Sequence, residues 1–215
     1  MCRKIFICAV AMAAIVCIGC GADKVVGSPE KAVLAYAELL TIGESANMAD
    51  AGFTEEDAKN LRKLVVQNFA DSFSGVVPLS AESSEELAKI FHENCKAKLN
   101  FQATVKTTEG DPVVELKTTP LDMDAAAKLV SDDLIALVGM VGKLKSEGAT
   151  EEQLRENPEV QKLAVTALSK YIAAIPLKDE TTFDVKCEKI DGSDGQVHWA
   201  PANVVSLANF LTSKK

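Results

Sequence analysis

The chain has 215 residues and a formal net charge of −8, from 31 acidic against 23 basic side chains. An acidic chain without a basic cluster is repelled by nucleic acid and by anionic lipid, so we expect no nucleic-acid partner. Apolar residues make up 47% of the sequence, which excludes a disordered stalk and suffices for one sizeable core or two small ones.

The first stretch of the chain predicts a secretory signal sequence. Arg3 and Lys4 precede an uncharged apolar run over 5–18, and small residues follow around Cys20. Three alternatives stay open. The run is about as long as the shortest membrane-spanning helix, so it could be an uncleaved anchor of about 17 residues. A cut after Ala22 would release a soluble protein, and Cys20 could be an ordinary thiol.

Gly19 and Cys20 resemble the lipobox of bacterial lipoproteins, in which the cysteine is lipidated and becomes the first residue of the mature chain. The family pattern places a Leu-like residue three positions before the cysteine, and Cys17 departs from it. The resemblance implies a lipoprotein signal peptide over 1–19, and a lipid anchor with a short tether over 20–27. It also implies a membrane as partner, through a lipid on Cys20, and a location in the cell envelope facing outside the cytoplasm.

Residues 28–213 are expected to form a single α+β domain that opens with a helix. Ser28 can cap this helix, Pro29 suits its first position, and Glu30 meets the positive end of its dipole. The stretch up to Gly43 resembles the opening helix of NTF2-like and cystatin-like domains in bacterial lipoproteins. Firmicutes lipoprotein families of unknown function are similar in layout, with extra helices added to a small sheet.

Two further helices are predicted before the sheet. The first begins at Thr54 with capping-box spacing, and the second begins at Ser83. The buried stripe expected for the first consists of Leu61, Leu64, Val65, Phe69 and Phe73.

The hydrophobic period changes from 3.6 to 2 at two places, which predicts β-hairpins at 98–118 and 182–200. We expect the two hairpins to join in one small antiparallel sheet with helices over one face. The inward positions predicted for the second hairpin are Phe183, Val185, Cys187, Val197 and Trp199.

A helical hairpin is predicted as an insertion between the two β-hairpins. Its first helix would run unbroken from Asp122 to Gly148, and its second from Asn157 to Pro176. The stripe expected for the first helix is Val130, Leu134, Leu137, Val138, Val141 and Leu144. Simple packing on the sheet is expected, because neither stripe sustains enough heptads, and a coiled-coil dimerisation arm is the alternative.

Cys95 and Cys187 are the two cysteines that follow the lipobox. An even number of cysteines in a domain outside the cytoplasm indicates that they could form a disulfide. Extending the alternation of the first hairpin backwards brings Cys95 onto the inward face that Cys187 shares. Cys95 could equally belong to the helix that starts at Ser83, and free buried cysteine is a common small apolar filler. The bridge and the two free thiols therefore both stay open.

The sequence contains no motif typical of catalysis, metal binding or cofactor binding. We therefore expect no catalytic residue, no metal ligand, no cofactor-binding residue and no cofactor. His92 begins a stretch like the helical zinc motif, but Lys96 stands where the second histidine must be. His198 is expected on the outer face of its strand as a surface group. The acidic stretch over 191–195 is expected to be an ordinary tight turn, with Gly192 and Gly195 chosen for positive φ.

The pattern as a whole predicts a membrane-anchored extracytoplasmic lipoprotein with a non-enzymatic binding or interaction domain. Its partner would be an unknown protein or small ligand. The alternative is an enzyme with an NTF2-like pocket acting on a small apolar substrate, for which Tyr36 and Tyr171 could line the pocket. Both tyrosines fall on apolar stripes, which favours core packing. The enzyme would need a buried carboxylate or histidine in the concavity of the sheet.

Overall fold

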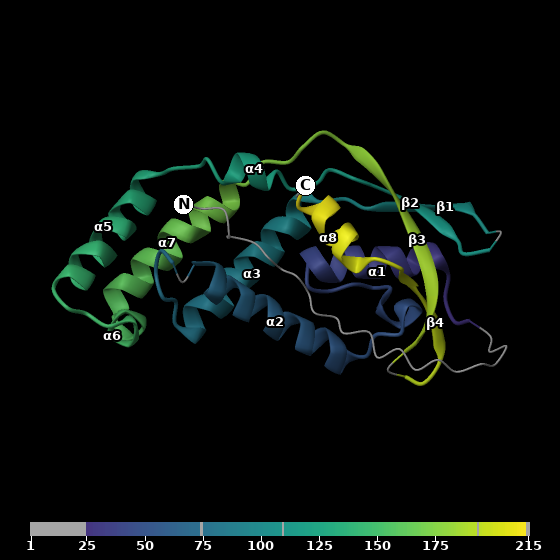
Figure 1. Cartoon of the computed structure of the whole chain (residues 1–215), viewed down its shortest axis with the longest axis horizontal. Coiled ribbons are helices and arrows are strands. Elements are labelled where there is room, and N and C mark those ends of the chain that lie inside the picture. The colour runs from purple at the N-terminus through teal and green to yellow at the C-terminus, as the bar shows by residue number, and fades with distance from the viewer. Residues whose placement is uncertain (1–24, 74, 109, 193, 214–215) are drawn as a thin grey trace. The chain divides into compact units, whose positions relative to one another are not determined.

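The computed structural model describes residues 25–73, 75–108, 110–192 and 194–213 (Figure 1). The signal peptide over 1–19 and the lipidation site Cys20 lie outside these residues, so both stay predictions. Where we expected a single domain over 28–213, the described chain divides into two compact units. The sheet unit comprises residues 25–62, 95–121 and 177–213, and the helical unit comprises residues 63–94 and 122–176.

The sheet unit contains a four-stranded antiparallel sheet in which sequence order and spatial order coincide. Its strands are β1 (Gln102–Thr107), β2 (Val113–Thr118), β3 (Thr181–Asp191) and β4 (Val197–Pro201). Pairing of β2 with β3 joins the two hairpins, with Val114 opposite Val185 and Leu116 opposite Phe183. The predicted α+β class, both hairpins and their union in one sheet are confirmed.

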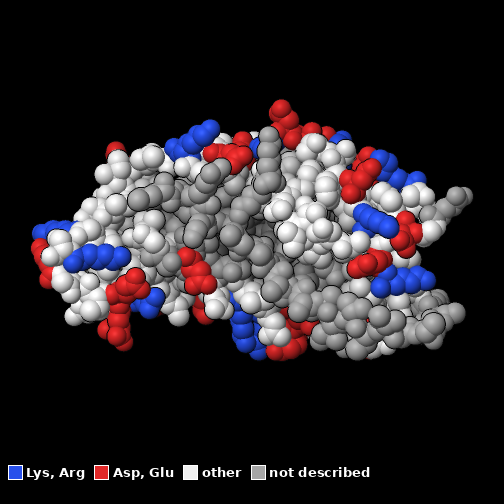
Figure 2. All heavy atoms as spheres, in the orientation of Figure 1, with Lys and Arg blue, Asp and Glu red and all other residues white. Residues whose placement is uncertain are grey.

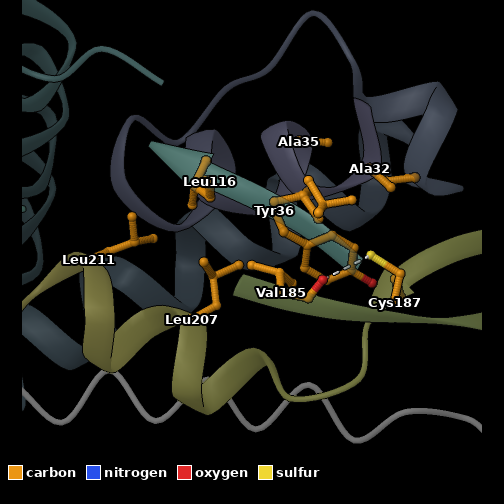
Figure 3. Close-up of a cluster of buried hydrophobic side chains, with 13 residues drawn as sticks. Ala32, Ala35, Tyr36, Leu116, Val185, Cys187, Leu207 and Leu211 are labelled. Carbon is orange, nitrogen blue, oxygen red and sulfur yellow. Dashed lines mark hydrogen bonds between the residues drawn. The ribbon is translucent and has the colours of Figure 1, made fainter. Parts of the chain in front are cut away.

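Two helices of the sheet unit, α1 (Pro29–Thr41) and α8 (Val204–Leu211), cover one face of the sheet. The core between them includes Ala32, Val33, Tyr36, Val114, Leu116, Val185, Cys187, Leu207 and Leu211. Figure 3 shows Tyr36 of α1 pointing toward Val185 and Cys187 of β3. The helix α1 has proline at its first turn and ends before Gly43, as predicted. Ser28 occupies the N-cap position, but its side chain makes no capping hydrogen bond.

The remaining helices before the sheet are η1 (Met48–Ala51), a 3₁₀ turn, α2 (Glu55–Phe73) and α3 (Ala81–Lys98). The capping box predicted at Thr54 is present, because Thr54 and Asp57 exchange backbone-to-side-chain hydrogen bonds of 2.8 and 3.2 Å. Of the stripe predicted for α2, Leu61 and Phe73 are buried and Leu64 is exposed. The helix α3 continues to Lys98, so the first strand begins later than the alternation from Leu99 suggested.

The helical insertion consists of α4 (Met123–Ala126), α5 (Asp132–Ser146), α6 (Glu151–Glu156) and α7 (Pro158–Ala174). The unbroken helix expected from Asp122 to Gly148 is therefore wrong. It is interrupted because Ser131 caps a new start, its side chain accepting a hydrogen bond from the Leu134 N–H at 3.2 Å.

The helices of the insertion pack among themselves, and their expected packing on the sheet stays a prediction. The helices α5 and α7 pack against each other (Figure 1) and bury Leu137, Val141, Ala164 and Leu168. Within the sheet unit, α1 and α8 cover the inner face of the sheet. Among the helices of the described ranges, none combines the length and the apolar character needed to cross a membrane.

Candidate functional site

His198 of β4 is fully buried, with 0% of its surface exposed, so the expectation of a surface histidine is wrong. The inward positions of β3 are spaced by two up to Cys187, but the next residue that packs on the core is Ile190, three positions later. Ile190 is paired with His198 across the ladder. The pairing of β3 with β4 is regular over this stretch. His198 and Ala200 are buried on β4, whereas Val197 and Trp199, the inward positions that we predicted, are only half-buried.

Both ring nitrogens of His198 lie against oxygen atoms of the chain itself. Nε2 is 3.0 Å from each carboxylate oxygen of Asp194, and Nδ1 is 3.3 Å from the backbone carbonyl oxygen of Asp50. Both of these neighbours can only accept hydrogen bonds, so a ring protonated at both nitrogens donates to both of them. The ring thus has no nitrogen left for an external group.

Two glycines lie close against the Cδ2 atom of the His198 ring. A Cβ atom on Gly52 would lie 2.7 Å from the Cδ2 atom of His198, and one on Gly192 would lie 2.6 Å from the same atom. The backbone of Gly52 also has a φ of +73°, which favours glycine. We call His198, Asp194, Asp50, Gly52 and Gly192 the His198 clamp.

The turn over 191–195 is consequently more than an ordinary tight turn. Gly195 has the expected positive φ of +76°, whereas Gly192 is required by the close approach of the His198 ring. Asp194 of this turn accepts hydrogen bonds from His198 and, at 3.0 Å, from the backbone N–H of Gln196. The clamp therefore fastens this turn to the end of η1, where Asp50 and Gly52 lie.

Asp194 stays ionised in the clamp. Burial alone would raise the pKa of its carboxyl, but the hydrogen bonds from the Gln196 N–H and from His198 outweigh burial and lower the pKa below its ordinary value. A carboxyl with a depressed pKa contributes stability that is present above its unfolded-state pKa and is lost as the pH falls through the folded-state pKa. The contribution of Asp194 is therefore complete at neutral pH and disappears in acid.

The geometry of the clamp suits a structural role. An Asp–His pair can serve in acid–base chemistry when one ring nitrogen reaches a substrate or a nucleophile. In His198 each nitrogen is occupied and the ring is shielded from solvent. Within the described ranges no group of three or more His, Cys, Asp and Glu side chains could hold a metal ion.

The cysteines Cys95 and Cys187 are both free and buried, so the structure does not contain the bridge that we considered. Cys95 lies in α3, and the backward extension of β1 that motivated the pairing does not exist. The Cys187 thiol instead donates to the carbonyl oxygen of Val185 at 3.8 Å. Both residues fill the core as small apolar groups.

We expect neither thiol to react in the folded protein. Burial raises the pKa of each to about 12, so almost no thiolate is present at neutral pH. Labelling with an aromatic disulfide reagent at pH 8, read by peptide mass spectrometry, should modify Cys95 and Cys187 in guanidinium and leave both intact in the native chain. Labelling of the native chain at the unfolded rate would contradict this. Labelling in guanidinium only after reduction would reveal a disulfide.

Of the other residues singled out from sequence, Tyr36 is buried in a core, and Tyr171 and His92 are half-buried. Tyr36 is buried in the sheet unit with its ring 4.9 Å from that of Phe53, and burial raises its pKa to about 12. Tyr171 belongs to the helical unit, where its ring meets Phe73 edge-on at 6.5 Å. His92 lies on α3 beside Phe91, without the second histidine that zinc would need.

The face of the sheet opposite α1 and α8 carries ion pairs between strands. Lys106 of β1 lies 2.9 Å from a carboxylate oxygen of Asp184 on β3 and 3.6 Å from one of Glu115 on β2. On the side of the molecule drawn in Figure 2, basic and acidic side chains are interspersed. This is a solvated surface of mixed charge.

Comparison with known proteins shows the fold alone. No protein-family model matches the chain, and no curated protein matches it at a significant level. Among solved structures, the chain resembles YcdA from Bacillus subtilis subsp. subtilis str. 168, which is described as a candidate lipoprotein, with a TM-score of 0.54 and 17% identity. The match covers 85% of this chain and 55% of that one, so the chain spans little more than half the length of YcdA.

Proposed function

We propose that this protein is a lipid-anchored envelope protein, held at a membrane through Cys20 and facing outside the cytoplasm. Its sheet unit would act as a non-enzymatic domain that binds a protein or a small ligand. The uncharged run that ends in Gly19-Cys20 supports the anchor, as does the fold shared with a protein described as a candidate lipoprotein.

One observation carries the proposal: the fold begins very soon after Cys20. The Val26 N–H donates to the Val197 carbonyl oxygen at 2.8 Å, and Val26 forms a parallel β-bridge with His198. Val26, inside the tether that we expect over 20–27, thus already pairs with β4. A fully extended chain from Cys20 to Val26 reaches only about 20–22 Å. A lipid on Cys20 would keep the β4 edge of the sheet unit close to the bilayer.

The His198 clamp supports a binding domain over the enzyme alternative. That alternative needs a buried carboxylate or histidine that a substrate can reach. His198 is buried, but its nitrogens are bound to Asp194 and Asp50 and its surface is fully covered. We also propose the NTF2-like or cystatin-like class for the sheet unit, because the opening helix α1 packs on an antiparallel sheet that follows it.

Replacing Cys20 with serine tests the anchor. In detergent phase separation of whole cells, we expect the wild-type protein to enter the detergent phase and to incorporate a palmitate analogue. The Cys20→Ser variant should lose the label and shift to the aqueous phase, because it has no thiol to acylate. Cys17→Ser is the matched control, since it changes the neighbouring cysteine of the same run, and it should behave as wild type.

Two results would contradict the proposal. Full partition of the Cys20→Ser variant into detergent would mean that the apolar run itself is the anchor. Equal labelling of the Cys20→Ser and wild-type proteins would place the lipid elsewhere.

A further inference from the structure

The helix α5 exposes an apolar face. Ile135 and Val138 are 60% and 53% exposed, and Gly139 and Gly142 continue the same face at helical spacing. The opposite side of the helix is the one that packs, through Leu137 and Val141. A solvent-facing helix surface is normally polar, so this face differs from an ordinary outer surface.

No packing contact among the described residues accounts for the two glycines of this face. A Cβ atom on Gly139 or on Gly142 would meet no heavy atom within 4 Å. Their backbone also lies outside the positive-φ region that demands glycine. A helix with glycine in its interior is less stable than one with alanine there, so we expect a packing reason for each glycine, and the residues that the structure describes supply none. Open space above both glycines leaves room for another helix to approach closely.

We propose that this face binds the α5 helix of a second copy of the chain in an antiparallel arrangement. A two-fold axis between Val138 and Gly139 would set Val138 against Gly139 of the partner subunit. The same axis would set Ile135 against Gly142 of the partner subunit. Each large side chain then meets a glycine, which is the self-complementary pattern that a two-fold interface requires. This interface is independent of the proposed anchor.

Charge complementarity favours the antiparallel second copy over other occupants. Asp132 stands at the start of α5 and Lys145 near its end, and both are exposed. The two-fold axis brings Asp132 next to Lys145 of the partner subunit at each end of the pair, whereas a parallel pair would juxtapose like charges. Asp133 is already engaged within the chain, 2.7 Å from Lys170. An anionic bilayer is a poorer occupant, since the chain has a net charge of −8.

Cross-linking of the full-length protein in intact cell envelopes tests the interface. Val138→Cys places a thiol beside the proposed axis, and a short bis-maleimide should join two copies. Glu152→Cys, at an exposed position of α6, is the matched control. Its thiol lies away from the proposed interface, so the bis-maleimide should not cross-link it. Adding Gly142→Leu to Val138→Cys should lower the yield of dimer about tenfold, because the leucine fills the space that Ile135 of the partner subunit needs.

A charge exchange distinguishes this pairing from any other occupant. On the Val138→Cys background, Asp132→Lys should reduce cross-linking, and the further change Lys145→Asp should restore it, because the pair is then rebuilt with reversed signs. The proposal is overturned if Val138→Cys cross-links no better than Glu152→Cys. It is equally overturned if the double exchange does not restore the dimer, or if the cross-linked product contains a different protein.

Discussion

Replacing His198 with alanine is expected to lower the free energy of unfolding of the sheet unit by about 4 kcal/mol. The ring is fully buried, so its removal leaves a cavity beside Gly52 and Gly192. Its removal also takes the hydrogen-bond partner from the Asp194 carboxylate and from the Asp50 carbonyl oxygen.

Urea denaturation followed by tryptophan fluorescence measures this loss. The chain has a single tryptophan, Trp199, next to His198 on β4, so the signal reports the sheet unit. Thr182→Ala, an exposed change on β3, is the control and should stay within about 0.5 kcal/mol of wild type. A loss below about 1 kcal/mol for His198→Ala would show that the ring does not hold the unit together.

Replacing Gly52 with alanine is expected to lower the same free energy by about 3 kcal/mol. Part of the loss is backbone strain at a φ of +73°. The larger part is a collision, because the new Cβ would lie 2.7 Å from the Cδ2 atom of His198. The ring cannot move aside, since Asp194 and Asp50 hold it at both nitrogens and Gly192 lies against it.

Gly195→Ala separates the two causes in the same fluorescence experiment. Gly195 has a nearly identical φ of +76°, but a Cβ atom there would meet nothing within 4 Å, so we expect a loss of only about 1 kcal/mol. The difference between the two glycine variants measures the contact with His198. In the double variant His198→Ala/Gly52→Ala the losses should be less than additive, because the collision is gone. Equal losses for Gly52→Ala and Gly195→Ala would contradict the clamp.

The parts of the fold that rest on local periodicity could be predicted from the sequence. The alternation of apolar and polar residues around Leu116 and Val185 identifies strands, because this pattern can be read from neighbouring residues alone. Glycine and proline residues mark the turns between the strands. The split of the long helix was also readable. Ser131 followed by Asp132 and Asp133 is a helix start, which the continuous apolar stripe obscured.

The clamp could not be predicted, because it depends on the register between segments that are far apart in the chain. The spacing of the core-packed positions on β3 changes from two residues to three between Cys187 and Ile190, and no local pattern of the sequence marks this change or the burial of His198 opposite Ile190. Asp50 lies 148 residues from His198 and contributes only its carbonyl oxygen, which any residue could supply. One signal is present in the sequence: the turn contains Gly192 in addition to Gly195, and Gly192 does not have the positive φ that would require glycine.

The most direct test of the proposed anchor is mass spectrometry of the N-terminal peptide of the protein purified from the cell envelope. We predict a mature chain that begins at Cys20, with a lipid on the cysteine and Val26 a few residues later. A mature chain that begins at Asp23, or a chain that retains Met1 and carries no lipid on Cys20, would contradict the account.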